Sequence, residues 1–255
     1  MALAFWGITR SLKNTIHSIE KHILHVLQEN NIEYKIFLHT YIITKPYSNN
    51  RNKEYNIQLD NEEYKLLHPD VYLLEDQEVI KKRVDVKKYR SHSDPWGTKY
   101  NSVDNFILAM YSKKCVTNLI EHSKMEFDYI IYLRPDVLYK NKFDVNFFNV
   151  VTDKTICIPD FHCYMTHIRF NDRFAICHPN HYRIYGRLFD LLYDYSKTKP
   201  AHSEIFQHTV LTQKGFQFKH VPFHFWRVRA NGTISQDRYS KEDLKWHVNP
   251  TYPYS

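Results

Sequence analysis

The sequence predicts an α/β fold, in which a mainly parallel central sheet is flanked by helices within a single domain. Apolar runs typical of buried strands alternate with amphipathic helical segments along most of the 255 residues. The N-terminal segment already contains a strand, a helix and a second strand, which is the composition of a parallel βαβ unit. No internal repeat or low-complexity segment interrupts this order.

The N-terminal unit has the clearest pattern. Residues 2–8 (ALAFWGI) form an apolar run that predicts a buried strand. From Leu12 to Gln28 the apolar residues recur at helical spacing, and two asparagines follow. Residues 34–41 (YKIFLHTY) predict a second strand, which a right-handed crossover would place parallel to the first.

The central part alternates between polar loops and apolar segments. Residues 42–65 are rich in Asn and Lys and predict a long loop with some strand, and residues 67–76 predict another strand or a short helix. The Ser, Asp-Pro and Gly content of residues 91–102 predicts a loop. A helix is expected over residues 103–120, bent near Ser112, and a strand over residues 128–134.

The C-terminal part continues the alternation. Residues 154–160 predict a strand, and residues 179–196 an amphipathic helix. A shorter helix over residues 202–215 is expected to have Ser203 as its N-cap and to end at Gly215. Aromatic residues at alternate positions of residues 216–229 predict one terminal strand, and the tail from Asn231 is polar.

The charge balance suits an anionic partner. The formal net charge is +7 and the isoelectric point is about 9.0, values that fit nucleic acid, a phosphorylated ligand or an acidic membrane surface. The alternative is that many lysines only solvate the surface. Because the chain has 5 glycines and neither glycine-rich phosphate-binding pattern, any phosphate must be met by side chains or a metal ion.

The cysteines and the N-terminus bear on the compartment. Cys115, Cys157, Cys163 and Cys177 form no C-x-x-C pair and no zinc-binding spacing, so reduced thiols are expected. The N-terminal MALAFWGITRS lacks the basic region of a signal peptide, and no window of about 18 apolar residues predicts a membrane span. A cytoplasmic protein is therefore expected.

The most informative stretch is DYIIYLRPDVLY, residues 128–139. Its strand ends on Arg134, Pro135 and Asp136, and open α/β sheets bind ligands outside the carboxyl ends of their strands. Pro135 ends the strand's hydrogen bonding, so two charged side chains project beyond it. Asp136 can bind Mg²⁺ or Mn²⁺ and Arg134 can grip a diphosphate; the alternative is a surface ion pair.

The segment FDYIIYLRPDVLY resembles the one that carries the D-x-D-type motif in GT-A-fold glycosyltransferases. The order of the segments is similar to that in a loosely characterised group of such enzymes from bacteria, algae and large DNA viruses: GITRSLKNTIHSI, YKIFLHTY, NSVDNFILAMYSKK, LRPDV, FNDRFAI, HSEIFQHTVLTQKG and FWRVRANG, roughly Leu3 to Gly232. The resemblance implies one GT-A-like domain, with a nucleotide-sugar donor half in residues 1–140 and an acceptor half with a C-terminal tail in residues 141–255. A viral member of the group would act in the host cytoplasm or belong to the virion.

The resemblance also implies a reaction. A sugar would move from a UDP- or GDP-linked donor to a glycan or another hydroxyl acceptor, with Mn²⁺ or Mg²⁺ at Asp136. His224 would complete the metal shell, with His220 as its rival. The chain departs from the motif because Arg134 replaces the first acidic residue. One carboxylate is a poorer metal site than two, and Arg134 can itself neutralise phosphate charge.

Further donor-binding positions follow from the resemblance: Arg10, His39, Ser102, Asn105, Asp172, Arg227 and Arg229. Arg10 would contact base or phosphate, and the alternative is a solvated residue before a helix. His39 would contact ribose or base, or be a hydrogen-bonded histidine under the sheet. Ser102 is also an N-cap candidate.

Asp172 lies in the polar cluster Asn171-Asp172-Arg173, which would contact the donor sugar or acceptor hydroxyls, or form an Asx turn. Arg227 and Arg229 share one face of the predicted terminal strand and would hold the diphosphate.

Glu204, in the HSE that opens a predicted helix, matches the place of the catalytic base in inverting GT-A enzymes. It would deprotonate the acceptor hydroxyl, and the anomeric configuration would invert. A retaining mechanism stays open. The alternative is that Glu204 only complements the helix dipole, which favours an ionised carboxylate at a helix N-terminus.

Two other classes of function are also compatible with the sequence. The isoelectric point and KKRVDVKKYR, residues 81–90, suit a nucleic-acid-binding protein or a nuclease, although the carboxylates of a two-metal centre are not clustered. A binding module without catalysis would use the same crevice. The resemblance itself predicts no nucleic-acid partner.

Overall fold

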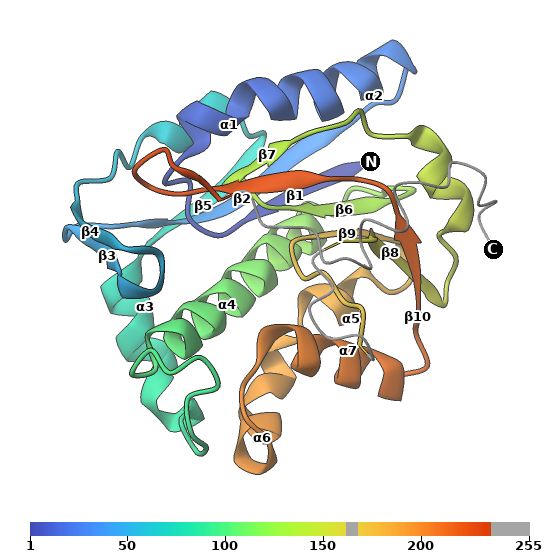
Figure 1. Cartoon of the computed structure of the whole chain (residues 1–255). Coiled ribbons are helices and arrows are strands. Elements are labelled where there is room, and N and C mark those ends of the chain that lie inside the picture. The colour runs from blue at the N-terminus through green and yellow to red at the C-terminus, as the bar shows by residue number, and fades with distance from the viewer. Residues whose placement is uncertain (162–167, 236–255) are drawn as a thin grey trace.

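The central element of the computed structural model is a seven-stranded sheet in the order β10-β8-β9-β6-β1-β2-β5 (Figure 1). Its strands are β1 (Ala2–Trp6), β2 (Lys35–Ile42), β5 (Val71–Asp76), β6 (Ile130–Leu133), β8 (Thr155–Pro159), β9 (Phe174–Cys177) and β10 (Gln217–Val221). Only β9 runs antiparallel to its neighbours, so the mainly parallel α/β sheet predicted from the sequence is confirmed. The structure describes residues 1–161 and 168–235; Cys163 and the tail beyond residue 235 lie outside this range.

Helices cover both faces of this sheet (Figure 1). On one face, α1 (Leu12–Ile19) continues through a π-helical turn (Glu20–Leu24) into α2 (His25–Glu29). On the other face lie α4 (Asn101–His122), α5 (Tyr182–Gly186), α6 (Phe189–Thr198) and α7 (Ser203–Gln213). Side chains alternate along each strand, so Leu3 and Phe5 join the core under α1, whereas Ala2 and Ala4 join the core under α4.

A second, three-stranded sheet of β7 (Val137–Tyr139), β11 (Phe225–Val228) and β12 (Ile234–Ser235) lies beside the first. The expected single strand over residues 216–229 is therefore wrong, because β10 belongs to the large sheet and β11 to the small one. Pro222 has no N–H for a ladder, and Phe223 N donates to Val221 O at 2.8 Å in a tight bend.

Most of the remaining elements lie in the segment between β2 and α4. The predicted polar loop contains a hairpin of β3 (Tyr47–Asn49) and β4 (Glu54–Ile57), and residues 67–76 contain β5. Short 3₁₀ helices occupy Asn50–Asn52, Glu63–Leu67, Val86–Tyr89 and Val145–Val150. The sequence pattern missed α3 (Gln77–Val84), whose first turn is capped by Asp76 Oδ1 accepting from Glu78 N at 2.8 Å and Val79 N at 3.0 Å.

Three predicted helices also differ in detail. The helix expected over residues 179–196 is two helices, α5 and α6, and the one expected to bend near Ser112 is the uninterrupted α4. In α7 the N-cap position is His202 rather than Ser203. Within the described residues no helix combines the length and apolarity that crossing a bilayer requires.

Gly186 allows α5 to pack closely against α4 and β6. A Cβ at this position would overlap Thr117 Oγ1 and the Tyr132 hydroxyl and lie 2.8 Å from Thr117 Cβ. At an uncrowded helical position, alanine instead of glycine would stabilise the fold. We expect Gly186→Ala to lower the free energy of unfolding by about 1–3 kcal/mol in urea denaturation, because the core must shift to accept a methyl group.

The double variant Thr117→Ala/Gly186→Ala is the control for this contact. It should lose less stability than the two single variants together, since Thr117→Ala removes part of the overlap. Strict additivity would show that the loss in Gly186→Ala arises elsewhere.

Candidate functional site

The site lies where two adjacent parallel strands end. β1 pairs with β2 on one side and with β6 on the other, so the chain leaves β1 and β6 at a topological switch point. The loop after β1 carries Arg10, and the turn after β6 carries Arg134 and Asp136. A cavity of about 220 Å³ opens here and is lined by all three side chains.

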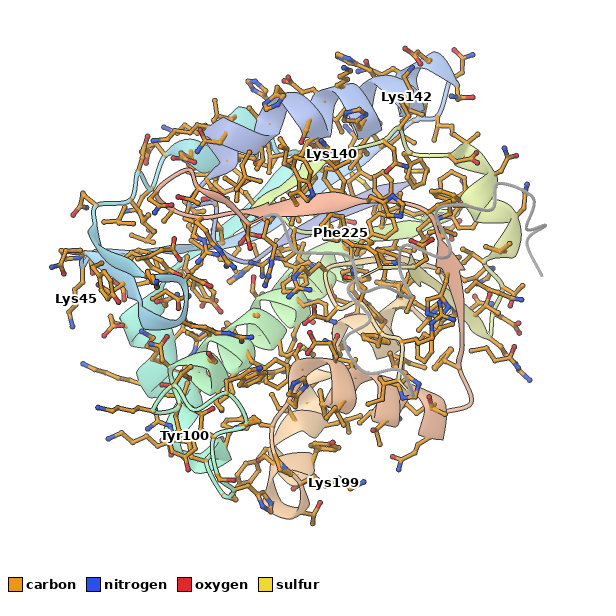
Figure 2. All side chains as sticks on the ribbon, in the orientation of Figure 1. Lys45, Tyr100, Lys140, Lys142, Lys199 and Phe225 are labelled. Atoms are coloured by element: carbon orange, nitrogen blue, oxygen red, sulfur yellow. The ribbon has the colours of Figure 1, made fainter. Side chains whose placement is uncertain are left out.

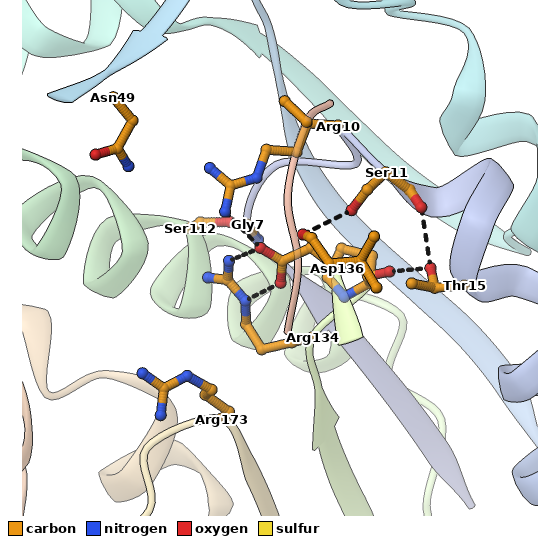
Figure 3. A network of polar contacts seen from close by, with 12 residues as sticks. Gly7, Arg10, Ser11, Thr15, Asn49, Ser112, Arg134, Asp136 and Arg173 are labelled. Atoms are coloured by element: carbon orange, nitrogen blue, oxygen red, sulfur yellow. Dashed lines mark hydrogen bonds and ion pairs between the residues drawn. The ribbon is translucent and has the colours of Figure 1, made fainter. Parts of the chain in front are cut away.

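Asp136 is held between two arginines (Figure 3). Arg134 donates from Nε to Oδ1 at 2.9 Å and from Nη2 to Oδ2 at 2.8 Å, and Arg10 Nη2 donates to Oδ2 at 3.1 Å. The aspartate is 5% exposed. Burial alone would raise its pKa, but the charges of Arg134 and Arg10 outweigh it and hold the pKa of Asp136 below its ordinary value. The carboxylate is therefore ionised at neutral pH.

Backbone contacts fix this ion cluster to the fold. Val228 N of β11 donates to Asp136 O at 3.0 Å, and Thr15 Oγ1 of α1 donates to Pro135 O at 2.6 Å. Gly7, at a φ of +99°, lies directly against Arg134, and a Cβ there would be 2.7 Å from Arg134 Nη1. Glycine is thus required both by the backbone conformation and by the guanidinium beside it.

Most of the predicted donor-binding residues line this cavity: Arg10, Ser102, Asn105, Arg134, Asp136, Asp172, Arg227 and Arg229. The lining also contains Arg51 and Arg173, so six arginines surround two aspartates. Figure 3 shows Arg10, Arg134 and Arg173 converging from different loops. Ser102 is not an N-cap, because α4 begins after Tyr100 and Ser102 N donates to Thr98 Oγ1 at 3.0 Å.

Three predicted histidines do not reach the cavity. His39 is fully buried, with Nδ1 2.7 Å from Ser112 Oγ and Nε2 3.1 Å from Glu75 Oε2, so both ring nitrogens have protein partners. His220 Nε2 lies 2.7 Å from Arg169 O, and His224 Nε2 lies 2.8 Å from Asp160 Oδ1. His39 thus matches the alternative of a hydrogen-bonded histidine under the sheet.

The structure does not bring Asp136 and His224 together as a metal pair. Val228 bonds to Asp136, and His224 lies four residues earlier, which is about 13 Å along an extended strand. Both Asp136 oxygens already accept from arginines. In the described part of the chain, the one group of three metal-ligating side chains is His39, Glu75 and Cys115, with ligand atoms within 4.8 Å of one another.

That buried group is closed by protein hydrogen bonds. Besides His39, the Glu75 carboxylate accepts from Arg83 Nη2 at 2.6 Å and Tyr111 Oη at 3.0 Å. These contacts, with the His39 hydrogen bond first, lower the pKa of Glu75 to about 2. Burial raises the pKa of the Cys115 thiol to about 12, so the thiol is protonated at neutral pH. These properties suit a structural network under the sheet.

A second cavity, of about 530 Å³, adjoins the first and shares Arg51, Trp96, Asp172, Arg173, Ser203 and Arg227 with it. Glu204, at the start of α7, lies in this second cavity. Burial, and then the nearby Asp172, raise the pKa of Glu204 to about 7. Burial therefore outweighs the stabilisation of an ionised carboxylate expected at a helix N-terminus.

Asp172 is one of the six residues that line both cavities. Arg173 N donates to Asn171 Oδ1 at 3.0 Å, which is the Asx turn given above as the alternative to a ligand-binding cluster. The Ser203 hydroxyl donates to Asp172 Oδ2, and Arg173 Nη1 lies 3.3 Å from Asp172 Oδ1. Ser203 thus joins the start of α7 to Asp172 instead of capping the helix.

Several residues of the lining were not predicted from the sequence, among them Arg51, Trp96 and Gln207. Trp96 stacks on His202, with ring centroids 4.9 Å apart and an interplanar angle of 24°. Trp96 could have been found from the sequence, because it is an aromatic residue in the otherwise polar loop DPWG, residues 94–97.

Gln207 accepts a hydrogen bond from the buried Lys113 Nζ at 2.5 Å, and burial lowers the pKa of Lys113 to about 7.

Lysines that raise the net charge lie elsewhere. Figure 2 shows Lys45, Lys142 and Lys199 at the outside of the molecule, and all three are exposed. In the basic segment of residues 81–90, Lys81 pairs with Glu78 at 2.7 Å and Arg83 with Glu75 at 2.6 Å. The concentration of positive charge in the cavity therefore comes from arginines.

No family model and no curated protein matches this sequence. Among solved structures, the chain is similar to the apo form of glycosyltransferase GlyE of Streptococcus pneumoniae TIGR4, with 12% identity, a TM-score of 0.43, and coverage of 85% of this chain and 44% of that one. It is also similar to galactosyltransferase LgtC, solved with donor and acceptor sugar analogues, with 12% identity, a TM-score of 0.46, and coverage of 86% and 73%. The chain spans less than half the length of the GlyE chain that it matches.

Asp136→Asn tests the ion cluster. Without the carboxylate charge, two largely buried guanidinium groups lose their counter-ion, so we expect a loss of about 3–5 kcal/mol in the free energy of unfolding at pH 7. Because the folded state lowers the pKa of Asp136, its contribution is complete above the unfolded pKa of about 3.9 and is lost as the pH falls further. Denaturation at several pH values should show the difference from wild type shrinking below about pH 4.

Asp194→Asn is the matched control, since the Asp194 side chain is 78% exposed and pairs only with Lys197 among the described residues. Its effect should stay below about 0.5 kcal/mol. A difference for Asp136→Asn that stays constant down to pH 3 would contradict the ion pairing.

Proposed function

We propose that this protein is a nucleotide-sugar-dependent glycosyltransferase. The observation that supports this best is the pair of joined cavities at the carboxyl ends of the parallel strands. The first presents arginines around an ionised aspartate, and the second presents a carboxyl group whose pKa is about 7. An anion-binding subsite beside a proton-accepting subsite suits transfer from a diphosphate leaving group to a hydroxyl.

The first cavity would bind the donor. A UDP- or GDP-linked sugar carries a diphosphate, and planar guanidinium groups bind phosphate oxygens with paired hydrogen bonds. When the bond between the anomeric carbon and the diphosphate oxygen breaks, the electron pair stays on that oxygen. The fixed cations of the cavity stabilise the charge that develops there. Arg227 and Arg229 belong to the half of the chain expected to bind the acceptor, so the donor would contact both halves.

The second cavity would bind the acceptor. Its glycan hydroxyl attacks the anomeric carbon, and Glu204 takes the hydroxyl proton as that bond forms. A general base works best when its pKa is near the working pH, which holds for Glu204. The Trp96 ring, which stacks on His202 and has the Arg51 guanidinium 5.9 Å from its centroid, adds an aromatic side chain to the lining of this cavity. One displacement with Glu204 as base inverts the anomeric configuration.

The donor assignment is tested by thermal unfolding with ligand panels. UDP- and GDP-sugars should raise the melting temperature, because a ligand that binds only the folded state adds about 2.7 kcal/mol of stability at 100 times its Kd. Oligonucleotides should leave it unchanged. Stabilisation by oligonucleotides that weakens steeply with salt, without any response to nucleotide sugars, would favour the nucleic-acid alternative.

The role of Glu204 is tested by the pH profile of transfer. Since only the deprotonated carboxylate accepts a proton, kcat/KM should rise with pH and level off above about pH 7. Glu204→Gln should lower kcat at least about 100-fold and leave donor binding intact. If Glu204 only complements the helix dipole, this variant would retain transfer with an unchanged profile.

Folding of the Glu204→Gln variant can be checked in the same samples. A raised pKa means that the folded state disfavours the ionised side chain, so the wild type loses stability as the pH rises through about 7. Above that pH the variant should melt no lower than wild type. A lower melting temperature at pH 8 would assign the loss of activity to the fold.

A further inference from the structure

Asp136 and Asp172, the two carboxylates that line the first cavity, do not fit the divalent metal ion that the GT-A resemblance implies. Mg²⁺ and Mn²⁺ need several oxygen ligands with available lone pairs. The Asp136 oxygens receive three arginine N–H groups at 2.8–3.1 Å. Asp172 accepts the Ser203 hydroxyl and lies 3.3 Å from Arg173. Neither aspartate belongs to a cluster of metal-ligating side chains in the described residues.

The charge of the cavity also opposes a cation. Six arginines line it together with two aspartates. Arg229 forms no side-chain hydrogen bond or ion pair within the described residues, and burial together with Arg227 and Arg10 lowers its pKa to about 10. A further divalent cation would add to this repulsion, whereas an anion with two or three negative charges would relieve it.

Two buried donors in the lining still need acceptors. Arg10 Nε and Trp6 Nε1 have no hydrogen-bond partner within residues 1–161 and 168–235, and Trp6 is 3% exposed. Buried N–H groups are almost always paired in folded proteins. A phosphate oxygen can accept a hydrogen bond from an N–H group, whereas a metal ion cannot. Within the described residues the same lining also holds two buried acceptors without a hydrogen-bond donor, Asn49 Oδ1 and Asp172 Oδ1. The choice of an anion over a metal ion therefore rests on the charge of the cavity and on the arginine contacts of Asp136.

We propose that the cavity binds the donor diphosphate through guanidinium groups alone, without a divalent metal ion, and that Asp136 is a positioning residue for Arg10 and Arg134. This inference rests on the proposed function, because it takes a nucleoside diphosphate as the ligand. Asp136 holds the two arginines in one orientation through the three hydrogen bonds above. Their remaining N–H groups, with those of Arg229, bind the phosphate oxygens and stabilise the leaving group after the anomeric C–O bond breaks.

Calorimetric titration with UDP, GDP and inorganic pyrophosphate tests the proposal, in EDTA and in excess Mn²⁺. The Kd of at least one nucleotide should agree within about threefold between the two conditions. Arg229→Gln should weaken binding about 10- to 100-fold in both, since hydrogen bonds to charged groups contribute that much. Lys199→Gln removes one exposed positive charge and should leave the Kd unchanged.

Asp136→Asn separates the positioning role from simple electrostatics. Removal of a negative charge from an anion site should by itself tighten binding. We expect weaker binding in EDTA instead, because Arg10 and Arg134 are no longer held, with circular dichroism confirming a folded variant. Tighter binding, or an effect seen only with Mn²⁺, would overturn the positioning role.

The outcomes distinguish the inference from the proposed function. Nucleotide binding that needs Mn²⁺ and disappears in EDTA would overturn metal-free recognition and leave the glycosyltransferase proposal standing. The absence of nucleotide and pyrophosphate binding in both conditions would overturn both. Equal binding in both conditions, lost in Arg229→Gln, supports both.

Discussion

The ion cluster of Arg10, Asp136 and Arg134 is the interaction on which the rest of the site depends. It joins the loop after β1 to the turn after β6, and the Asp136 carbonyl continues the connection to β11 of the small sheet. Charges taken out of water are stable only when they are paired with good geometry. Three side chains from two loops must therefore keep one arrangement, and Gly7 leaves the space that this arrangement needs.

Burial raises the pKa of the carboxyl group in both cavities, and the charges beside each carboxyl group decide whether it is ionised. In the first, arginines outnumber aspartates and keep Asp136 ionised. In the second, burial and the proximity of Asp172 make ionisation of Glu204 less favourable, so its pKa approaches neutrality. Asp172 belongs to the lining of both. One site thus combines a fixed cationic surface with a carboxyl group whose pKa is near neutrality.

Local patterns predicted the elements that local interactions determine. The apolar runs correspond to β1, β2 and β6, whose residues are mostly buried. The segments with helical periodicity correspond to α1 with α2 and to α4. The predictions were wrong where the end of a helix or strand depends on tertiary packing. Aromatic residues stand at alternate positions of residues 216–229, as they would in one strand. The segment is nevertheless divided at Pro222 between two sheets. The short α3 carries so many charged residues that its buried positions, Ile80 and Val84, gave no visible periodicity.

The sequence by itself determined the chemistry that the site can use, because residue type sets charge, and a strand that stops before Pro135 must present Arg134 and Asp136 at its carboxyl end. Only the tertiary structure decided which of those groups meet. Arg10 and Asp136 are 126 residues apart and pair because β1 and β6 are neighbours. The sequence led us to expect His39 at the ribose or base and His224 in the metal shell, but their rings pair with Glu75 and Asp160. Long-range pairing arises from strand order and burial, and neither is encoded in the spacing of residues along the chain.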